Sequence, residues 1–244
     1  MPRLHVDLAL APGLETPLPA GAARHVQVLR LQPGQAVTLF DGRGCDWPAE
    51  ILRMGRSEVL VRVGEPQSVE RELPVAVTLA LGMPANDRMD WLVEKATELG
   101  AAAIEPLVCE RSVLRLAGER ADKRVAHWRG IAAAAAEQCG RARLPRIAAP
   151  RGFGEWLRER AAADGEARLV LSLADGTTAL AQVLRTDPRA LCLLSGPEGG
   201  LSPAEDAAAR AAGWQPVTLG ARVLRAETAP LAALAAAGVL AAGG

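Results

Sequence analysis

The chain has 244 residues, which is enough for one large domain or two smaller ones. Its 28 basic and 28 acidic residues balance, which argues against a protein that coats nucleic acid through bulk charge but does not exclude a local basic patch. The four cysteines form no C-x-x-C pair and the three histidines show no ligand spacing, so we expect neither a disulfide framework nor a metal site. The first residues lack a signal-peptide pattern and the alanine-rich end is too short to span a membrane, so a cytoplasmic protein is expected.

Residues 1–68 are predicted to form a small β-rich domain. Val59, Val61 and Val63 share one parity along the chain, which is the period of a half-buried strand. Glycine-bearing turns such as DGRG at 41–44 separate the candidate strands, and several short strands closed by tight turns favour a barrel. A short helix is expected within 20–31. Its inward residues would be Ala23, Val26 and Leu29, and its outward residues Arg24, His25 and Arg30.

Residues 74–244 show a different pattern, in which apolar strands alternate with amphipathic helices. The polar stretch 64–74 is the predicted linker. Such alternation implies a mostly parallel sheet covered by helices on both faces. The predicted strands are Val75–Leu81, Ile104–Val108, Leu169–Leu173, Leu191–Leu194 and Val217–Leu219. The predicted helices run from Asn86 or Asp87 to Leu99 (apolar face Met89, Leu92, Val93, Ala96 and Leu99), over Glu119–Cys139 and Phe153–Ala162, from Ser202, and along the end of the chain.

The stretch 191–228 carries most of the functional prediction. Its first strand leads into the loop SGPEGG at 195–200, whose glycines let a ligand approach the backbone closely. Ser202 and Glu205 then form a capping box around a proline at the first helical position, so a helix begins beside this loop. The strand Val217–Leu219 ends at Gly220 and opens into a second loop. Because the carboxyl ends of neighbouring parallel strands meet at one edge of a sheet, we expect both loops to line one ligand pocket.

The residues of these loops restrict the ligand. The first loop has no P-loop lysine, and Glu198 would repel a phosphate, so a cationic or hydroxyl-bearing ligand suits the loop better. The alternative is a tight turn whose glycines serve geometry alone. In the second loop, Arg222 and Arg225 are suited to hold an anion or the edge of a base. Glu227 is open to two interpretations, an ion pair inside the loop or a functional carboxylate.

Four segments, in this order along the chain, resemble the RsmE family of ribosomal small-subunit RNA methyltransferases, which belongs to the SPOUT superfamily. They read EKATELG at 94–100, AEQCGR at 136–141, LSGPEGGLS at 194–202 and LGARVLRAETA at 219–229, and a run ending VLRL at 28–31 matches as well. The resemblance covers essentially the whole chain. It departs from the family pattern at 85–87, where more lysine is usual, and at Cys139, where serine is common.

The resemblance implies a fold and an activity that composition cannot indicate. Residues 1–68 would be a PUA-like β-barrel that helps to hold RNA, and residues 74–244 would be a SPOUT α/β domain with a deep trefoil knot. The family acts as a homodimer. It transfers a methyl group from S-adenosylmethionine to the N3 atom of one uridine in the 16S rRNA of the assembled small subunit. No metal is required.

The resemblance, together with the chemistry of the residues, assigns expected roles. The catalytic candidates are Arg222 and Arg225, which would stabilise a uracil anion, and Glu198 or Glu227, either of which could accept its proton. The expected S-adenosylmethionine contacts are Leu173, Ser195, Gly196, Gly199, Gly200, Leu219, Gly220, Leu224 and Thr228. The expected RNA contacts are Arg3, Arg24, His25, Arg30, Arg111, Arg115, Arg141 and Arg143.

Two other functions compete with this prediction. A non-catalytic RNA-binding or ribosome-assembly factor could keep the fold without turnover, but the intact loops speak against it. A nucleotide-dependent α/β enzyme would need phosphate-binding features that the sequence lacks. The alanine-rich faces of the long helix and of the final helix offer a dimer surface, or else they pack within one subunit.

Overall fold

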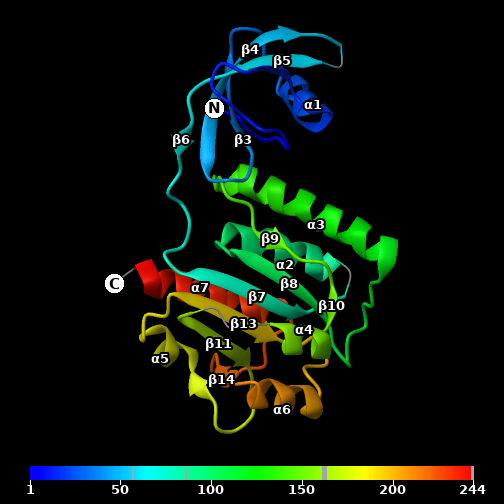
Figure 1. Cartoon of the computed structure of the whole chain (residues 1–244), viewed down its shortest axis with the longest axis vertical. Coiled ribbons are helices and arrows are strands. Elements are labelled where there is room, and N and C mark those ends of the chain that lie inside the picture. Colours follow the sequence, from blue (N-terminus) through cyan, green and yellow to red (C-terminus); the bar gives the residue numbers. More distant parts are fainter. Residues whose placement is uncertain (57, 86, 161–163, 243–244) are drawn as a thin grey trace. The chain divides into compact units, whose positions relative to one another are not determined.

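The computed structural model describes residues 1–56, 58–85, 87–160 and 164–242, and the chain divides into two compact units (Figure 1). Unit 1 comprises Met1–Glu72 together with Ala133–Leu144, and unit 2 comprises Leu73–Ala132 and Pro145–Gly244. The sequence suggested two consecutive segments, 1–68 and 74–244. In the structure a later stretch, 133–144, packs with the N-terminal residues instead.

Unit 1 is built on a mainly antiparallel, barrel-like sheet with the strand order β1-β3-β4-β5-β2, and β6 pairs with β4. Alternate residues of β5, which are Val59, Val61 and Val63, are buried, so the period-two pattern of the sequence places one face of this strand in the core. The elements of this unit are β1 (Arg3–His5), β2 (Glu15–Pro17), α1 (Ala20–Val28), β3 (Ala36–Phe40), β4 (Cys45–Met54), β5 (Val59–Val63) and β6 (Gln67–Ser68).

The prediction for α1 was correct except at its end. Ala23 and Val26 are buried, and the arginines and the histidine of the predicted outer face are exposed. Leu29, predicted to face inward, is 43% exposed. The helix ends at Val28, and Leu29 is its C-cap residue at the exposed end of the helix.

Unit 2 contains a parallel sheet with the order β10-β8-β7-β13-β11-β14-β12, and β9 pairs with β8. The predicted α/β class and parallel sheet are confirmed. The strands are β7 (Ala76–Gly82), β8 (Ala103–Val108), β9 (Arg146–Ile147), β10 (Arg151–Gly152), β11 (Glu166–Leu171), β12 (Thr178–Ala179), β13 (Ala190–Ser195) and β14 (Gln215–Thr218). The helices are α2 (Asp87–Glu98), α3 (Gly118–Cys139, whose last residues belong to unit 1), α4 (Phe153–Glu159), α5 (Leu180–Leu184), α6 (Pro203–Ala211) and α7 (Thr228–Ala242).

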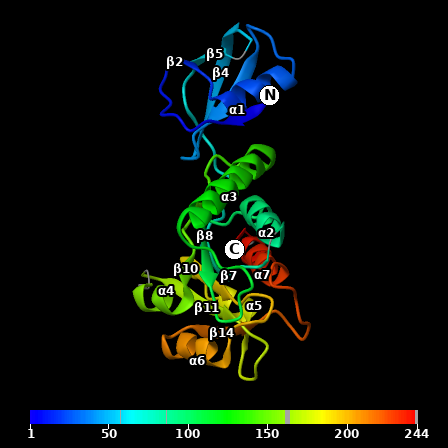
Figure 2. The same cartoon turned by 90° about the vertical axis from the view of Figure 1, so that its right-hand side faces the viewer.

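Helices cover both faces of this sheet (Figure 2). The strand residues alternate between two cores. In β13, Leu191 and Leu193 pack with residues of α2, α5 and α7, whereas Cys192 and Leu194 pack with residues of α4 and α6. Strands buried on both faces read as continuous apolar runs, which explains why their sequences lack polar alternation.

The helix predictions for this unit hold within a residue or two, except that α4 ends at Glu159, three residues before the predicted Ala162. Met89, Leu92, Val93 and Ala96 of α2 are fully buried, and Leu99 is partly buried just beyond the helix. Asn86, one of two predicted caps, and 161–162, the predicted end of α4, lie outside the described residues. Among the described residues no helix is both long and apolar enough to cross a bilayer. The trefoil knot stays a prediction.

Candidate functional site

Three loops at the carboxyl edge of the unit 2 sheet line one cavity of about 470 Å³. They follow β13, β11 and β14, which are neighbours in the sheet, so their carboxyl ends meet at one place. The expectation that the two glycine loops share a pocket is therefore met in the structure. The residues of the predicted cofactor set that line this cavity are Leu173, Ser195, Gly196, Gly199, Gly200, Leu219, Gly220 and Leu224.

Glycine is required in this cavity for geometric reasons. A Cβ atom at Gly196 would lie 2.4 Å from the backbone nitrogen of Leu201, so any side chain there would displace the loop. Gly82, at the end of β7, meets the same loop, and a Cβ atom there would lie 2.4 Å from Pro197. Gly220 has a φ of 107°, which L-amino acids with side chains rarely adopt. The loops therefore present backbone atoms to the cavity.

The start of α6 forms another part of the wall. The side chain of Ser202 accepts a hydrogen bond from the backbone nitrogen of Glu205 at 3.3 Å, and the Glu205 carboxylate accepts one from the backbone nitrogen of Ser202 at 2.9 Å. The predicted capping box is confirmed. The other oxygen of Glu205 accepts from the backbone nitrogen of Glu110 at 2.8 Å, which ties α6 to the segment after β8.

Two polar side chains that line the cavity, Ser195 and Glu198, differ in their hydrogen bonding. Ser195 is 4% exposed, and its hydroxyl has no hydrogen-bond partner among the described residues. A buried hydroxyl without a partner is unfavourable, so a ligand that bonds to it would gain free energy. Glu198 is already bonded, because its Oε1 accepts from the backbone nitrogen of Ala85 at 2.8 Å and from Arg88 at 3.5 Å.

Residues of the loop before α7 line two different spaces, the cavity described above and a second hollow. Arg222 is exposed and lines the cavity, whereas Arg225 is exposed and does not line it. Glu227 and Thr228 line a second hollow of about 310 Å³. Thr228 is thus the one predicted cofactor contact that does not line the first cavity. Glu227 is 8% exposed, its Oε2 has no hydrogen-bond partner, and it has no ion pair in the described part of the chain.

The buried thiols of Cys109 and Cys192 are unreactive near neutral pH. Burial raises the pKa of Cys109 to about 12, and the nearby Glu205 carboxylate adds to the rise. Burial likewise raises the pKa of Cys192 to about 12 against the opposing effect of Arg160. Both thiols are therefore protonated near neutral pH and are poor nucleophiles. No cluster of side chains that could hold a metal ion is found among the described residues.

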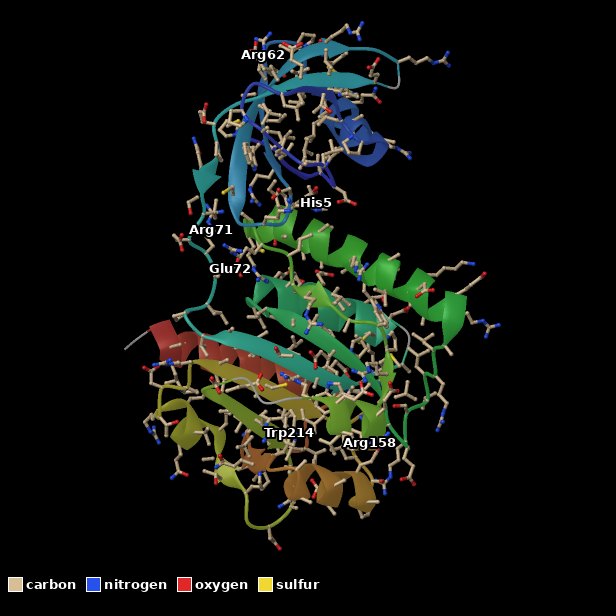
Figure 3. All side chains as sticks on the ribbon, in the orientation of Figure 1. His5, Arg62, Arg71, Glu72, Arg158 and Trp214 are labelled. Carbon is tan, nitrogen blue, oxygen red and sulfur yellow. The ribbon has the colours of Figure 1, made fainter. Side chains whose placement is uncertain are left out.

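Two of the predicted RNA contacts, Arg3 and Arg141, form ion pairs and hydrogen bonds within unit 1. Arg3 pairs with Asp46 at 2.6 Å and donates to the carbonyl oxygens of Ala136 and Arg141 at 2.9 and 3.2 Å. Arg141 is 3% exposed and pairs through two nitrogens, at 3.1 and 2.5 Å, with Glu72, which is labelled in Figure 3. This burial speaks against an RNA contact of Arg141, because its guanidinium faces a carboxylate and not the solvent.

The other candidate RNA contacts are exposed, and their contact with RNA stays a prediction. They are Arg24, His25, Arg30, Arg111, Arg115 and Arg143. His25 lies 3.9 Å from a carboxylate oxygen of Glu137. Arg111 donates to the carbonyl oxygen of Gly199 at 2.9 Å and lines the cavity, so it also fixes the first glycine loop. Arg115 donates to the carbonyl oxygen of Glu110.

Two residues at the start of α2 were not predicted to take part in the site. Arg88 bonds to Glu198, and Trp91 is 45% exposed in the second hollow. The predicted apolar face of α2 leaves Trp91 on the opposite side of the helix. A large aromatic residue on the solvent face of a helix could therefore have been recognised from the sequence as a candidate binding residue. The contact of Arg88 could not, because its partner lies 110 residues away in the sequence.

Comparison with known proteins identifies the family. An RNA methyltransferase domain model matches residues 71–238, and a model of the RNA methyltransferase PUA domain matches residues 18–64. Ribosomal RNA small subunit methyltransferase E of Synechocystis is 37% identical over 212 residues, 86% of this chain and 67% of that protein. The protein of the same name from Bacillus subtilis is 33% identical over 218 residues, covering 86% and 84%. This chain belongs to the ribosomal RNA small subunit methyltransferase E family.

Solved structures of similar proteins cover nearly the whole chain. The family member from Neisseria gonorrhoeae, bound to S-adenosylmethionine, has a TM-score of 0.88 and 36% identity, and the match covers 97% of this chain and 96% of that one. A Legionella pneumophila methyltransferase in complex with S-adenosylmethionine has a TM-score of 0.87 and 34% identity, with coverage of 99% and 97%. Both units of this chain therefore have counterparts in family members.

Proposed function

We propose that this chain uses S-adenosylmethionine to methylate the N3 atom of a specific uridine in 16S rRNA, within the assembled small ribosomal subunit. Membership of the family, whose members are named as small-subunit rRNA methyltransferases, supports the reaction class. The observation that carries the proposal is the cavity of about 470 Å³, which the family's two C-terminal signatures line together. Two solved relatives bound to S-adenosylmethionine support the choice of methyl donor.

The residues of the cavity fit S-adenosylmethionine. The cavity has the size of an ordinary small-molecule site. The backbone of Gly196, Leu219 and Leu224 would bracket the adenine, and Leu173 would pack beside it. Ser195 offers a hydroxyl without a partner, and the absence of a Cβ atom at Gly196 leaves the backbone open to close approach. S-adenosylmethionine bound here supplies an electrophilic methyl carbon next to a sulfonium, which the carboxylate-bearing loop tolerates.

The charged residues at the edge of the cavity would prepare the acceptor. Uracil N3 carries a proton and lies between two carbonyl oxygens, so it must lose that proton before its electron pair can attack the methyl carbon. Arg222 or Arg225 would stabilise the resulting anion through the carbonyl oxygens. Glu198 or Glu227 would accept the proton. An arginine beside a carboxylate provides both functions without a metal.

The substrate context and the assembly belong to the same proposal. RNA in the small subunit would bind through the PUA-like unit 1 and through exposed arginines of both units, and the site of action would be the cytoplasm. A homodimer would use the faces of α3 and α7. Much of α7 already packs within its own subunit, because Leu231, Ala233 and Leu234 are buried, whereas Val239 is 74% exposed near its end.

Transfer of tritium from labelled S-adenosylmethionine to purified, unmethylated small subunits tests this proposal. We expect stoichiometric labelling of one nucleotide, which digestion and mass spectrometry would identify as N3-methyluridine. Binding of S-adenosylmethionine without transfer would instead support a non-catalytic assembly factor. Binding of ATP or NAD in place of S-adenosylmethionine would contradict the proposed cofactor.

A further inference from the structure

A second hollow, of about 310 Å³, lies at the starts of α2 and α7. Its lining residues are Asp87, Arg88, Trp91, Glu227 and Thr228. The hollow lies next to the cofactor cavity along the chain. Ala226 and Ala229 line the cavity, and Glu227 and Thr228, which lie between them, line the hollow. A further connection is made by Arg88, which lines the hollow and bonds to Glu198 in the cavity. The two spaces are therefore adjacent.

Glu227 lines this hollow and carries a buried acceptor without a partner. Its side chain is more than nine-tenths buried, and its Oε2 has no hydrogen-bond partner among the described residues. A buried carboxylate oxygen without a donor is unfavourable, and a ligand N–H group would satisfy it. Glu198 differs in this respect, because one of its oxygens already accepts hydrogen bonds from the backbone nitrogen of Ala85 and from Arg88. Of the two carboxylates, Glu227 is thus the one that holds a buried oxygen without a hydrogen-bond donor.

Trp91 supplies an aromatic surface beside this carboxylate. The chain has only five tryptophans, two phenylalanines and no tyrosine, and all seven aromatic residues lie in the described part of the chain. Trp91 is the one among them with an exposed side chain, at 45%. An exposed indole that lines a polar hollow is suited to stack on a planar base.

We propose that this hollow receives the target uracil, with its ring stacked on Trp91 and its N3–H donated to the free oxygen of Glu227. This inference rests on the proposed function. In the reaction the N3–H bond breaks and Glu227 takes the proton. The N3 electron pair forms the bond to the methyl carbon, and the electrons of the broken carbon–sulfur bond stay on sulfur, which becomes a neutral thioether. Arg88 donates to a flanking carbonyl oxygen of the ring.

The same arrangement selects uracil over cytosine. Cytosine N3 carries no proton, and its lone pair would face the carboxylate oxygen of Glu227, which is repulsive. A site built to accept a hydrogen bond rejects a ligand that cannot donate one, because the buried group stays unpaired. The hollow also has two carboxylates and one guanidinium, so it is unsuited to a phosphate.

Single-turnover methyl transfer to unmethylated small subunits tests the role of Glu227. We expect Glu227→Gln to bind S-adenosylmethionine as wild type does but to transfer the methyl group about 100-fold more slowly, or slower still. Glu198→Gln should have a smaller effect. Glu119→Gln, an exposed change at the start of α3, should match wild type. A Glu227→Gln protein with the wild-type rate would overturn the inference while leaving the proposed function intact, and a wild-type protein without transfer would overturn both.

Trp91 gives an independent test that does not depend on the folding of the Glu227 variant. Trp91→Ala should raise the KM for small subunits by about tenfold, as expected for a lost stacking contact, with little change in affinity for S-adenosylmethionine. Trp91→Phe keeps an aromatic ring, so its KM for small subunits should be close to that of the wild type. If Trp91→Ala left the KM unchanged, or if light scattering showed that it only separates two copies of the chain, the hollow would not be the base site.

Discussion

The charged residues of unit 1 and those of the loop before α7 in unit 2 are used in opposite ways. In unit 1, Arg3 and Arg141 are largely buried and paired with carboxylates. In the loop before α7, Arg222 and Arg225 are exposed and have no ion pair among the described residues, and Glu227 is buried without a hydrogen-bond donor for one oxygen. The first group is satisfied within the protein, so we expect it to act on stability. The second group is available to a ligand, so we expect it to act on catalysis.

Removing the buried guanidinium of unit 1 should have the largest effect on stability. Arg141→Ala leaves Glu72 without its partner and should lower the free energy of unfolding by about 3 kcal/mol, measured by urea denaturation. Arg62→Ala is the matched control, because Arg62 pairs with Glu15 at 2.8 Å in an exposed position (Figure 3). It should lower the free energy by less than about 1 kcal/mol. If Arg141→Ala kept the wild-type stability but bound RNA more weakly, Arg141 would be an RNA contact and not a structural residue.

Removing an arginine from the loop before α7 should affect the rate instead. Arg225→Ala should keep the wild-type affinity for S-adenosylmethionine and the wild-type stability, while methyl transfer slows by about 100-fold, the usual consequence of losing one donor to a developing anion. Arg158→Ala, an exposed arginine of α4, serves as the control and should keep the wild-type rate. A parallel loss of cofactor binding and transfer in Arg225→Ala would contradict the proposed division of roles.

The cap of α6 is expected to have the smallest effect. Ser202→Ala removes the side-chain bond to the first turn of α6 and should lower the free energy of unfolding by about 1 kcal/mol. Because the first turn of α6 lines the cavity, affinity for S-adenosylmethionine should fall slightly as well. Ser68→Ala, which removes a hydroxyl that donates to the exposed Glu70, should change neither quantity. Equal effects of the two substitutions would show that the cap does not position the cavity wall.

The sequence predicted features that depend on near neighbours. The capping box at Ser202, the buried face of α2 and the glycine loops at two strand ends all follow from spacings of a few residues. Because β13, β11 and β14 are adjacent, those loops meet in one cavity. The pairing of Arg141 with Glu72 could not be predicted in this way, because it joins residues 69 positions apart. The contact between Arg88 and Glu198 and the packing of 133–144 with Met1–Glu72 could not be predicted for the same reason.

Calorimetric titration of S-adenosylmethionine is the most direct test of the cavity lined by both glycine loops. Gly196→Ala adds one carbon that would lie 2.4 Å from the backbone of Leu201, whereas a Cβ atom at Gly130 of α3 meets no atom within 4 Å. Wild type and Gly130→Ala are predicted to bind S-adenosylmethionine with equal affinity, and Gly196→Ala is predicted to lose measurable binding while staying folded. A folded Gly196→Ala protein that binds S-adenosylmethionine as tightly as wild type would contradict the assignment of this cavity to the methyl donor.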